Sequence, residues 1–318
     1  MKAAVVTAAG KTPVYGDFKE PVAREGEVRV KVTAAALAPL SKSRAAGTHY
    51  SSTSVFPFIP GVDGVGRLDD GRRVYFAKPE APFGSMAELT VVRREQCVPV
   101  PDDLDDVTAA AIANPGMSSM AALKERAKLV AGETVLINGG TGSAGRLSIQ
   151  VAKYLGAKKV IVTGRDEESL RGLRELGADV IIPLAPPEGF ASAVGEQIRS
   201  GGVDVVLDYL WGPSAEQIII AAAKNGKDGA RVRYVEIGSL GGETIQLPGQ
   251  ALRATGLELM GSGVGSVAIE RLVAGIEEVM RVATPRHFEV KTRAVRLADV
   301  ERAWAEDTGT PRLVFLVE

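Results

Sequence analysis

The sequence is poor in the side chains that bind transition metals. Its 318 residues include one cysteine, Cys97, and two histidines, His49 and His287, which are far apart. A single cysteine excludes an intrachain disulfide, which fits a cytoplasmic protein. A catalytic zinc ion takes three N, O or S ligands from the protein. The sequence therefore predicts that any catalysis by this protein proceeds without a bound zinc ion.

Charge of one sign and long apolar runs are also absent. The net charge of −1 provides no electrostatic footprint for nucleic acid. No run of about 18 apolar residues predicts a membrane span, and the apolar part of the first ten residues is too short for a secretory signal. The chain is longer than one hydrophobic core usually holds, so we expect two domains.

A glycine-rich turn follows the apolar run from Val135 to Ile137. Gly140, Gly142 and Gly145 match G-x-G-x-x-G between a predicted strand and a predicted helix. Glycine there allows a tight turn and close approach of the backbone to a pyrophosphate, which the helix N-terminus attracts. The motif predicts dinucleotide binding, and a turn that only packs is the alternative. The residues expected at the pyrophosphate are Gly140, Thr141, Gly142, Ala144 and Gly145.

Strands dominate the first hundred residues, and strands alternate with helices after residue 134. Val28, Val30 and Val32 alternate with charged residues, as in a half-buried strand. Six later strands with helical crossovers predict an α/β fold with a doubly wound parallel sheet. They are expected at 134–138, 159–163, 180–182, 203–207, 232–237 and 257–260. We also expect helices at 108–113 and 118–129 separated by a break at Pro115-Gly116, and a tail that returns to the β-rich part.

Several short motifs occur in the order found in one enzyme superfamily. They are Pro60-Gly-Val-Asp-Gly-Val-Gly66, Gly84-Ser-Met-Ala-Glu88, residues 104–117, the glycine fingerprint, Leu176-Gly-Ala-Asp179 and Arg312-Leu-Val-Phe315. The chain thereby resembles the medium-chain dehydrogenase/reductase superfamily, and within it the zinc-free, zeta-crystallin-like quinone oxidoreductases. The resemblance implies a GroES-like catalytic domain from both chain ends, residues 1–117 and 263–318, and a Rossmann domain at 118–262. It also implies a homodimer, paired through the last strand of the nucleotide sheet.

The resemblance implies an NADPH-dependent enzyme. Without a metal there is no strong Lewis acid to hold an alkoxide, which favours hydride transfer to a quinone or an α,β-unsaturated carbonyl. An enoyl-thioester reductase and a non-catalytic NADPH-binding protein are the alternatives. Gly61-Val62-Asp63 stands where zinc-dependent relatives have Gly-His-Glu, and Asp63 either survives as a polar group or braces the turn. Ala38 and Ser41 stand where quinone reductases often carry Asn and Asp. The candidate catalytic residues are Ser41 and Tyr50, the latter as a hydrogen-bond donor to a substrate carbonyl.

Further positions are expected to contact the cofactor. The resemblance places Ser118 and Gly238 near the nicotinamide, although Ser118 is equally an N-cap candidate for the following helix. Tyr209, with Trp211, either lines the cofactor cleft or packs its loop.

The strand that ends at Thr163 lacks the terminal acid of NAD-specific enzymes, and Gly164 and Arg165 follow it. We therefore expect Thr163, Gly164 and Arg165 at the adenosine ribose, with Arg165 selecting the 2′-phosphate of NADPH. Asp166 complicates this arrangement: its charge repels phosphate if the side chain points inward, and capping of the next helix is the alternative.

Overall fold

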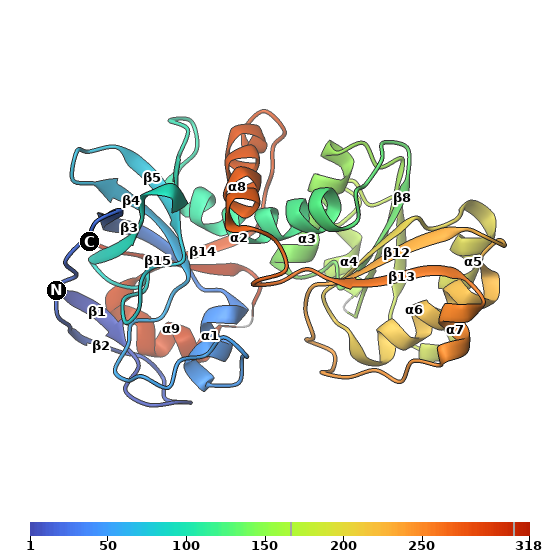
Figure 1. Cartoon of the computed structure of the whole chain (residues 1–318), viewed down its shortest axis with the longest axis horizontal. Helices are drawn as coiled ribbons and strands as arrows, with labels where there is room; N and C mark the ends of the chain where they lie inside the picture. Colours follow the sequence, from blue (N-terminus) through green and yellow to red (C-terminus); the bar gives the residue numbers. More distant parts are fainter. Residues whose placement is uncertain (166, 308) are drawn as a thin grey trace. The chain divides into compact units, whose positions relative to one another are not determined.

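The computed structural model describes residues 1–165, 167–307 and 309–318, so Asp166 lies outside the described part of the chain. The chain forms two compact units (Figure 1). Unit 1 consists of Met1–Asn114 and Ile276–Glu318, and unit 2 of Pro115–Gly275. The domain limits given above, at residues 117 and 262, stay a prediction.

Unit 2 is built on a parallel sheet. Its six strands are β8 (Thr134–Asn138), β9 (Lys159–Gly164), β10 (Val180–Pro183), β11 (Val205–Asp208), β12 (Arg231–Glu236) and β13 (Gly256–Gly261). They lie in the order β10-β9-β8-β11-β12-β13, and every pair is parallel. This is the doubly wound order, in which the chain reverses direction across the sheet between β8 and β11. The predicted α/β class and the six strands are confirmed.

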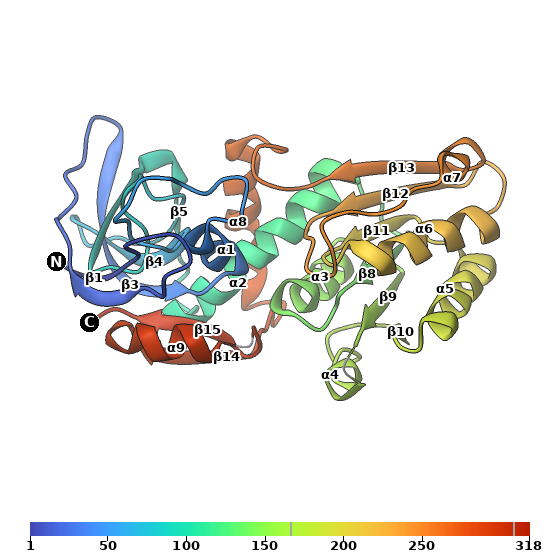
Figure 2. The same ribbon diagram turned by 90° about the horizontal axis from the view of Figure 1, so that it is seen from below.

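Helices cover both faces of this sheet, because right-handed crossovers that run in opposite directions fall on opposite sides. The helices are α3 (Ser143–Tyr154), α4 (Glu167–Arg171), α5 (Pro187–Gly201), α6 (Gly212–Asn225) and α7 (Gly249–Arg253). Figure 2 shows α5 and α6 together beside the sheet. They bury Phe190, Val194 and Ile218 against apolar side chains of β8 to β12. Burial of such a face, more than helix propensity, holds these helices in place.

The predicted break at Pro115 is wrong. Helix α2 (Asp106–Met120) passes through Pro115 without interruption and continues as a π-helix over Ala121–Arg126. Proline removes one N–H donor from a helix. Here the segment from Ala109 to Ala113 is completely buried, and Ser119 Oγ donates to the Pro115 carbonyl at 2.9 Å. Tertiary packing therefore overrides the local preference.

Unit 1 is a mixed β-structure assembled from both parts of the chain. Its strands are β1 (Lys2–Val5), β2 (Val14–Asp17), β3 (Glu27–Ala36), β4 (Asp63–Leu68), β5 (Arg73–Ala77), β6 (Leu89–Arg93), β7 (Cys97–Pro99), β14 (Thr292–Arg296) and β15 (Arg312–Leu316). Strand β15 pairs antiparallel with β3, which confirms that the tail returns to the β-rich first part. Unit 1 also contains α1 (Pro39–Ala46), α9 (Val300–Glu306), the first part of α2, and the later part of α8 (Ile269–Ala283), which begins in unit 2.

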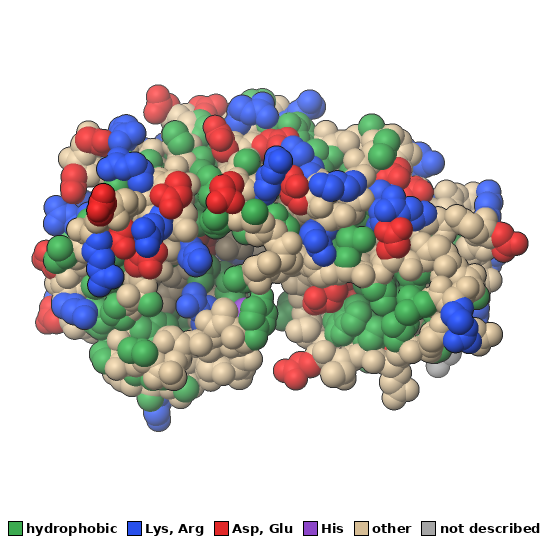
Figure 3. All heavy atoms as spheres, viewed as in Figure 1, with side chains coloured by type: hydrophobic (Ala, Val, Ile, Leu, Met, Phe, Trp, Pro, Cys, Tyr) green, Lys and Arg blue, Asp and Glu red, His purple; other side chains and the backbone are tan. Residues whose placement is uncertain are grey.

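The surface charges are mixed. On the face drawn in Figure 3, Lys and Arg side chains alternate with Asp and Glu, as the net charge of −1 leads one to expect. Within the described ranges, no helix is long and apolar enough to cross a membrane.

Candidate functional site

The glycine-rich turn joins β8 to α3 at the carboxyl edge of the unit 2 sheet, where doubly wound proteins bind ligands. A Cβ on Gly145 would lie 2.3 Å from the Gly139 carbonyl oxygen, and one on Gly140 would lie 1.9 Å from a Val162 methyl group. Both glycines are therefore needed for close packing. A Cβ on Gly142 would meet nothing within 4 Å, although Gly142 is the N-cap of α3. The open space lies where backbone N–H groups of a helix N-terminus attract an anion.

Buried polar side chains hold this turn from below. Asn138 Nδ2 donates to Asp208 Oδ1 at 2.8 Å, and Thr163 Oγ1 donates to Asn138 Oδ1 at 2.7 Å. The Gly139 N–H donates to Thr163 Oγ1 at 3.2 Å. The three side chains come from the ends of β8, β9 and β11, and burial raises the pKa of Asp208. Sequence reasoning missed Asn138, although a polar residue at the end of an apolar strand is a usable signal.

Within unit 2, the structure brings together the three residues expected on the nicotinamide side, Ser118, Tyr209 and Gly238. The Tyr209 hydroxyl lies 2.5 Å from Ser148 Oγ and 3.4 Å from Ser119 Oγ, and Ser118 also lies within hydrogen-bonding reach of it. A Cβ on Gly238 would lie 3.2 Å from the Tyr209 carbonyl oxygen. Burial raises the pKa of Tyr209, so its hydroxyl stays protonated and can donate.

Two of the alternatives left open by the sequence can now be judged. Ser118 lies inside α2 and not at its start, so the N-cap interpretation is wrong. The Trp211 ring packs edge-on against Tyr234, with the ring centroids 6.1 Å apart, and contributes to the core of unit 2. Trp211 thus packs the loop after β11, and a second role beside the cofactor stays a prediction.

The expected adenosine side lies beyond the end of β9. A Cβ on Gly164 would lie 2.6 Å from the Thr141 methyl group, so Gly164 lets Thr141 pack closely. Arg165 is exposed. Arg146, which sequence reasoning missed, is buried, and its Nε donates to the Thr141 carbonyl at 3.2 Å. Its Nη2 donates to the Ser169 carbonyl at 3.4 Å, so Arg146 ties the glycine-rich turn to α4.

Unit 1 contains a cavity of about 350 Å³, a size typical of small-molecule sites. Ser41, at the start of α1, lines it, and the Ser41 side chain is only 2% exposed. In the described part of the chain, Ser41 Oγ has no hydrogen-bond partner. Tyr50 is 75% exposed and stacks at 4.1 Å on His49, outside the set of described residues that line the cavity. The structure thus places one of the two candidate catalytic residues in a cavity.

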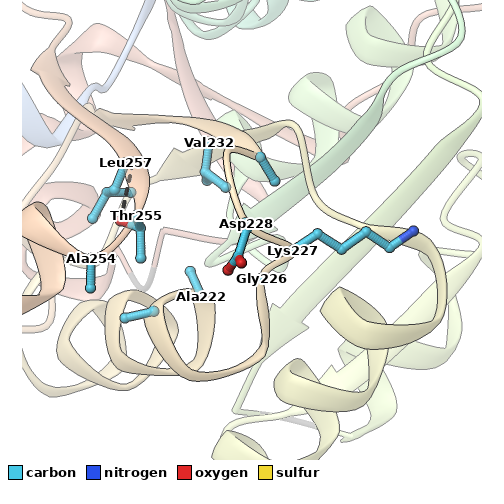
Figure 4. A pocket seen from close by; sticks show the side chains of 10 residues that line it. Ala222, Gly226, Lys227, Asp228, Val232, Ala254, Thr255 and Leu257 are labelled. Atoms are coloured by element: carbon cyan, nitrogen blue, oxygen red, sulfur yellow. Dashed lines mark hydrogen bonds between the residues drawn. The ribbon is translucent and has the colours of Figure 1, made fainter.

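A second, smaller pocket of about 50 Å³ lies in unit 2 (Figure 4). It is formed where α6 ends and where β12 and β13 begin, which is the amino edge of the sheet. Small side chains such as Ala222 and Ala254 dominate its wall, and Thr255 Oγ1 accepts a hydrogen bond from the Leu257 N–H at 3.2 Å. This pocket is too small for a dinucleotide, and it lies at the sheet edge opposite the glycine-rich turn, so we do not assign it to the cofactor.

Comparison with known proteins agrees with this arrangement. Residues 144–281 match the family model described as zinc-binding dehydrogenase. A probable NADPH-dependent quinone reductase of Emericella nidulans, tdiC, is 28% identical over 99% of this chain and 100% of its own length. A solved quinone oxidoreductase of Thermus thermophilus, also determined in complex with NADPH, is 27% identical, with a TM-score of 0.80 over 99% of this chain and 100% of that one.

These comparisons support the quinone oxidoreductase family of the medium-chain dehydrogenase/reductase superfamily for this chain. The predicted family is therefore confirmed. A further relative, an NADPH-dependent alkenal/one oxidoreductase of Arabidopsis thaliana, is 34% identical over 51% of this chain and 46% of its own length. The chain thus spans about half the length of that relative.

The matched model of this superfamily names zinc, and the residues of this chain do not fit it. In residues 1–165, 167–307 and 309–318, no three His, Cys, Asp or Glu side chains gather to hold a metal ion. Asp63 is 1% exposed and accepts a hydrogen bond from the Tyr75 hydroxyl at 2.8 Å. Burial raises the pKa of Asp63 to about 6, against the opposing effects of Arg312, Tyr75 and Asn114. Asp63 therefore belongs to the interior of unit 1, and metal independence stays a prediction.

Proposed function

We propose that this protein is an NADPH-dependent oxidoreductase that transfers a hydride to a quinone or an α,β-unsaturated carbonyl compound. The observation that carries the proposal is the open space at Gly142, above the N-terminus of α3, in a chain that aligns end to end with a protein named as an NADPH-dependent quinone reductase. When bound, the reduced nicotinamide supplies the hydride. The chain itself binds and orients both reactants.

Each group of residues has a role in this proposal. The glycine-rich turn would hold the pyrophosphate through residues 140–142, Ala144 and Gly145. Ser118, Tyr209 and Gly238 would border the nicotinamide, and the serines around the Tyr209 hydroxyl fix that ring. Thr163 acts indirectly, because its hydroxyl is already engaged with the turn. Gly164 and Arg165 would border the adenosine ribose.

Ser41 would orient the acceptor. A buried hydroxyl without a partner loses the hydrogen bonds it makes with water, so a carbonyl oxygen that enters the cavity is favoured there. The hydroxyl donates to that oxygen as negative charge develops on it. Solvent water supplies the proton that completes the reduction.

Alanine substitutions at three glycines test cofactor binding. Gly142→Ala should leave folding unchanged, since its Cβ meets no protein atom, and should weaken NADPH binding by about tenfold or more because the methyl group occupies the proposed pyrophosphate space. Gly145→Ala should destabilise the fold, because its Cβ meets a carbonyl oxygen. Gly189→Ala, in α5, is the matched control: it should leave NADPH binding unchanged and should not destabilise the fold, since alanine is the better helix former. NADPH affinity is read from nicotinamide fluorescence and stability from urea unfolding. Unchanged NADPH binding by the Gly142 variant would contradict the proposal.

We also propose a homodimer that pairs through β13. This strand lies at the edge of the sheet, hydrogen-bonded to β12, and the described residues place no strand on its other side. Its residues from Glu258 to Gly261 are half-buried, and an open edge strand of this kind is a liability unless it is covered. Sedimentation at micromolar concentration should show a dimer, and a monomer alone would refute the idea.

A further inference from the structure

The charges that line the unit 1 cavity all have the same sign. Apolar side chains, among them Phe58, Ile59 and Phe83, form much of the wall. The charged residues on it are Arg44, from α1, and Lys19, from the segment after β2. Within the part of the chain that the structure describes, no aspartate or glutamate lines the cavity. An apolar cavity with positive charge alone favours a ligand that carries negative charge.

Arg44 is the more important of the two cationic groups, because it is half-buried and has no acidic partner among the described residues. No ion pair or side-chain hydrogen bond joins it to another described residue, and burial lowers the pKa of its guanidinium. The neighbouring Lys42 takes Asp307 as its partner at 3.2 Å. His49, the other titratable group close to Arg44, has its pKa lowered by burial and by the Arg44 charge, so it stays neutral at neutral pH. No described group therefore neutralises Arg44.

Ser41 and Arg44 lie on the same face of α1, since residues three apart in a helix are neighbours. Both line the cavity, one with a buried hydroxyl and the other with a fork of N–H donors that matches an acidic group. A single small molecule can therefore reach Ser41 with a carbonyl oxygen and Arg44 with an anionic group.

We propose that the natural acceptor is a small α,β-unsaturated carbonyl compound or quinone that carries an anionic group, a carboxylate or a phosphate, and that Arg44 binds this group. The proposal rests on the function proposed above. Arg44 is then a specificity-determining residue, and Lys19, which is exposed, adds positive charge at the same cavity.

Three acceptors of one scaffold test the proposal: benzylideneacetone, its para-carboxylate and its para-phosphonate. The purified full chain should reduce an anionic congener with a kcat/KM about ten- to 150-fold above that of the neutral compound, as expected for one charged hydrogen-bonded contact. The better of the two anionic congeners identifies the group. Arg44→Gln should remove the preference and leave neutral-compound turnover and the KM for NADPH unchanged. Arg44→Lys should restore part of the preference, and Arg72→Gln, at an exposed arginine paired with Asp70, should keep all of it.

Equal turnover of the neutral and anionic compounds by the wild-type protein would overturn the proposal. So would an Arg44→Gln variant that loses activity equally with all three, or whose KM for NADPH rises instead, since Arg44 would then serve the fold or the cofactor. If the wild-type protein reduces neither these acceptors nor a simple quinone with NADPH, the proposed function fails. Calorimetric titration with the para-carboxylate then tests the role of Arg44 independently of activity. The wild-type protein should bind this compound, and the Arg44→Gln variant should not.

Discussion

Replacing Asp63 by asparagine isolates the effect of one buried carboxyl on stability. The side chain is 1% exposed, and its Oδ1 has no hydrogen-bond partner among the described residues. Burial raises the pKa of Asp63 from its ordinary 3.8 to about 6. At about 1.4 kcal/mol for each pH unit between these values, ionisation of Asp63 lowers the free energy of unfolding by about 3 kcal/mol.

The direction follows from proton binding. Between pH 4 and pH 6 the folded protein holds the Asp63 proton and the unfolded chain has lost it, so stability falls as the pH rises through this window. Asparagine does not titrate. The unfolding free energy of wild type minus that of Asp63→Asn should therefore fall by up to about 3 kcal/mol from pH 4 to pH 7. Any constant offset between the two proteins does not affect this comparison.

Urea unfolding at half-unit pH steps gives this difference directly. Asp17→Asn is the control, because Asp17 is exposed and its pKa is lowered by Lys2, so its difference should run in the opposite direction. A flat profile for Asp63→Asn would show that Asp63 titrates normally. A difference that rises with pH would show that the attraction of Arg312 outweighs burial, and either result refutes the reasoning.

The remaining predictions concern the cofactor site and the metal. Arg165→Ala should weaken NADPH binding about ten- to 150-fold and leave NADH binding unchanged, because only the 2′-phosphate is lost as a partner; an equal loss for both, measured by fluorescence titration, would disprove it. Tyr209→Phe should lower the unfolding free energy by about 1 kcal/mol, since the hydroxyl contacts Ser148 and Ser119; unchanged urea unfolding would contradict this. Activity should survive prolonged chelation, and elemental analysis that finds about one zinc per chain would rule out metal independence.

The Rossmann unit could be predicted in some detail, because its signals are local. Each strand is a short apolar run bounded by glycine or polar residues, and the six predicted strands agree with β8 to β13 within two residues. The glycine fingerprint is also a local pattern. Pro115 is the instructive failure, since no local rule could show that complete burial of the preceding helical turn would carry α2 through it.

The candidate acceptor site was much harder to predict. Ser41 was named through the family resemblance, whereas Arg44 was not named at all. An arginine in a short, polar segment looks like any surface charge. Its importance depends on what surrounds it in space: the apolar cavity wall, the absence of a facing carboxylate in the described residues, and Asp307, which comes from far along the chain to pair with Lys42. Sequence spacing carries none of this information.

The pairing of β15 with β3 also bears on how the protein is made. A ribosome releases the chain from its N-terminus, and β3 precedes its partner by more than half of the polypeptide. Unit 2, which is continuous in sequence, can complete its sheet while the end of the chain is still being synthesised. Strand β3 lacks its partner β15 until the end of the chain has been synthesised. Nascent unit 1 is therefore the part of this protein most accessible to chaperones and most prone to aggregation during translation.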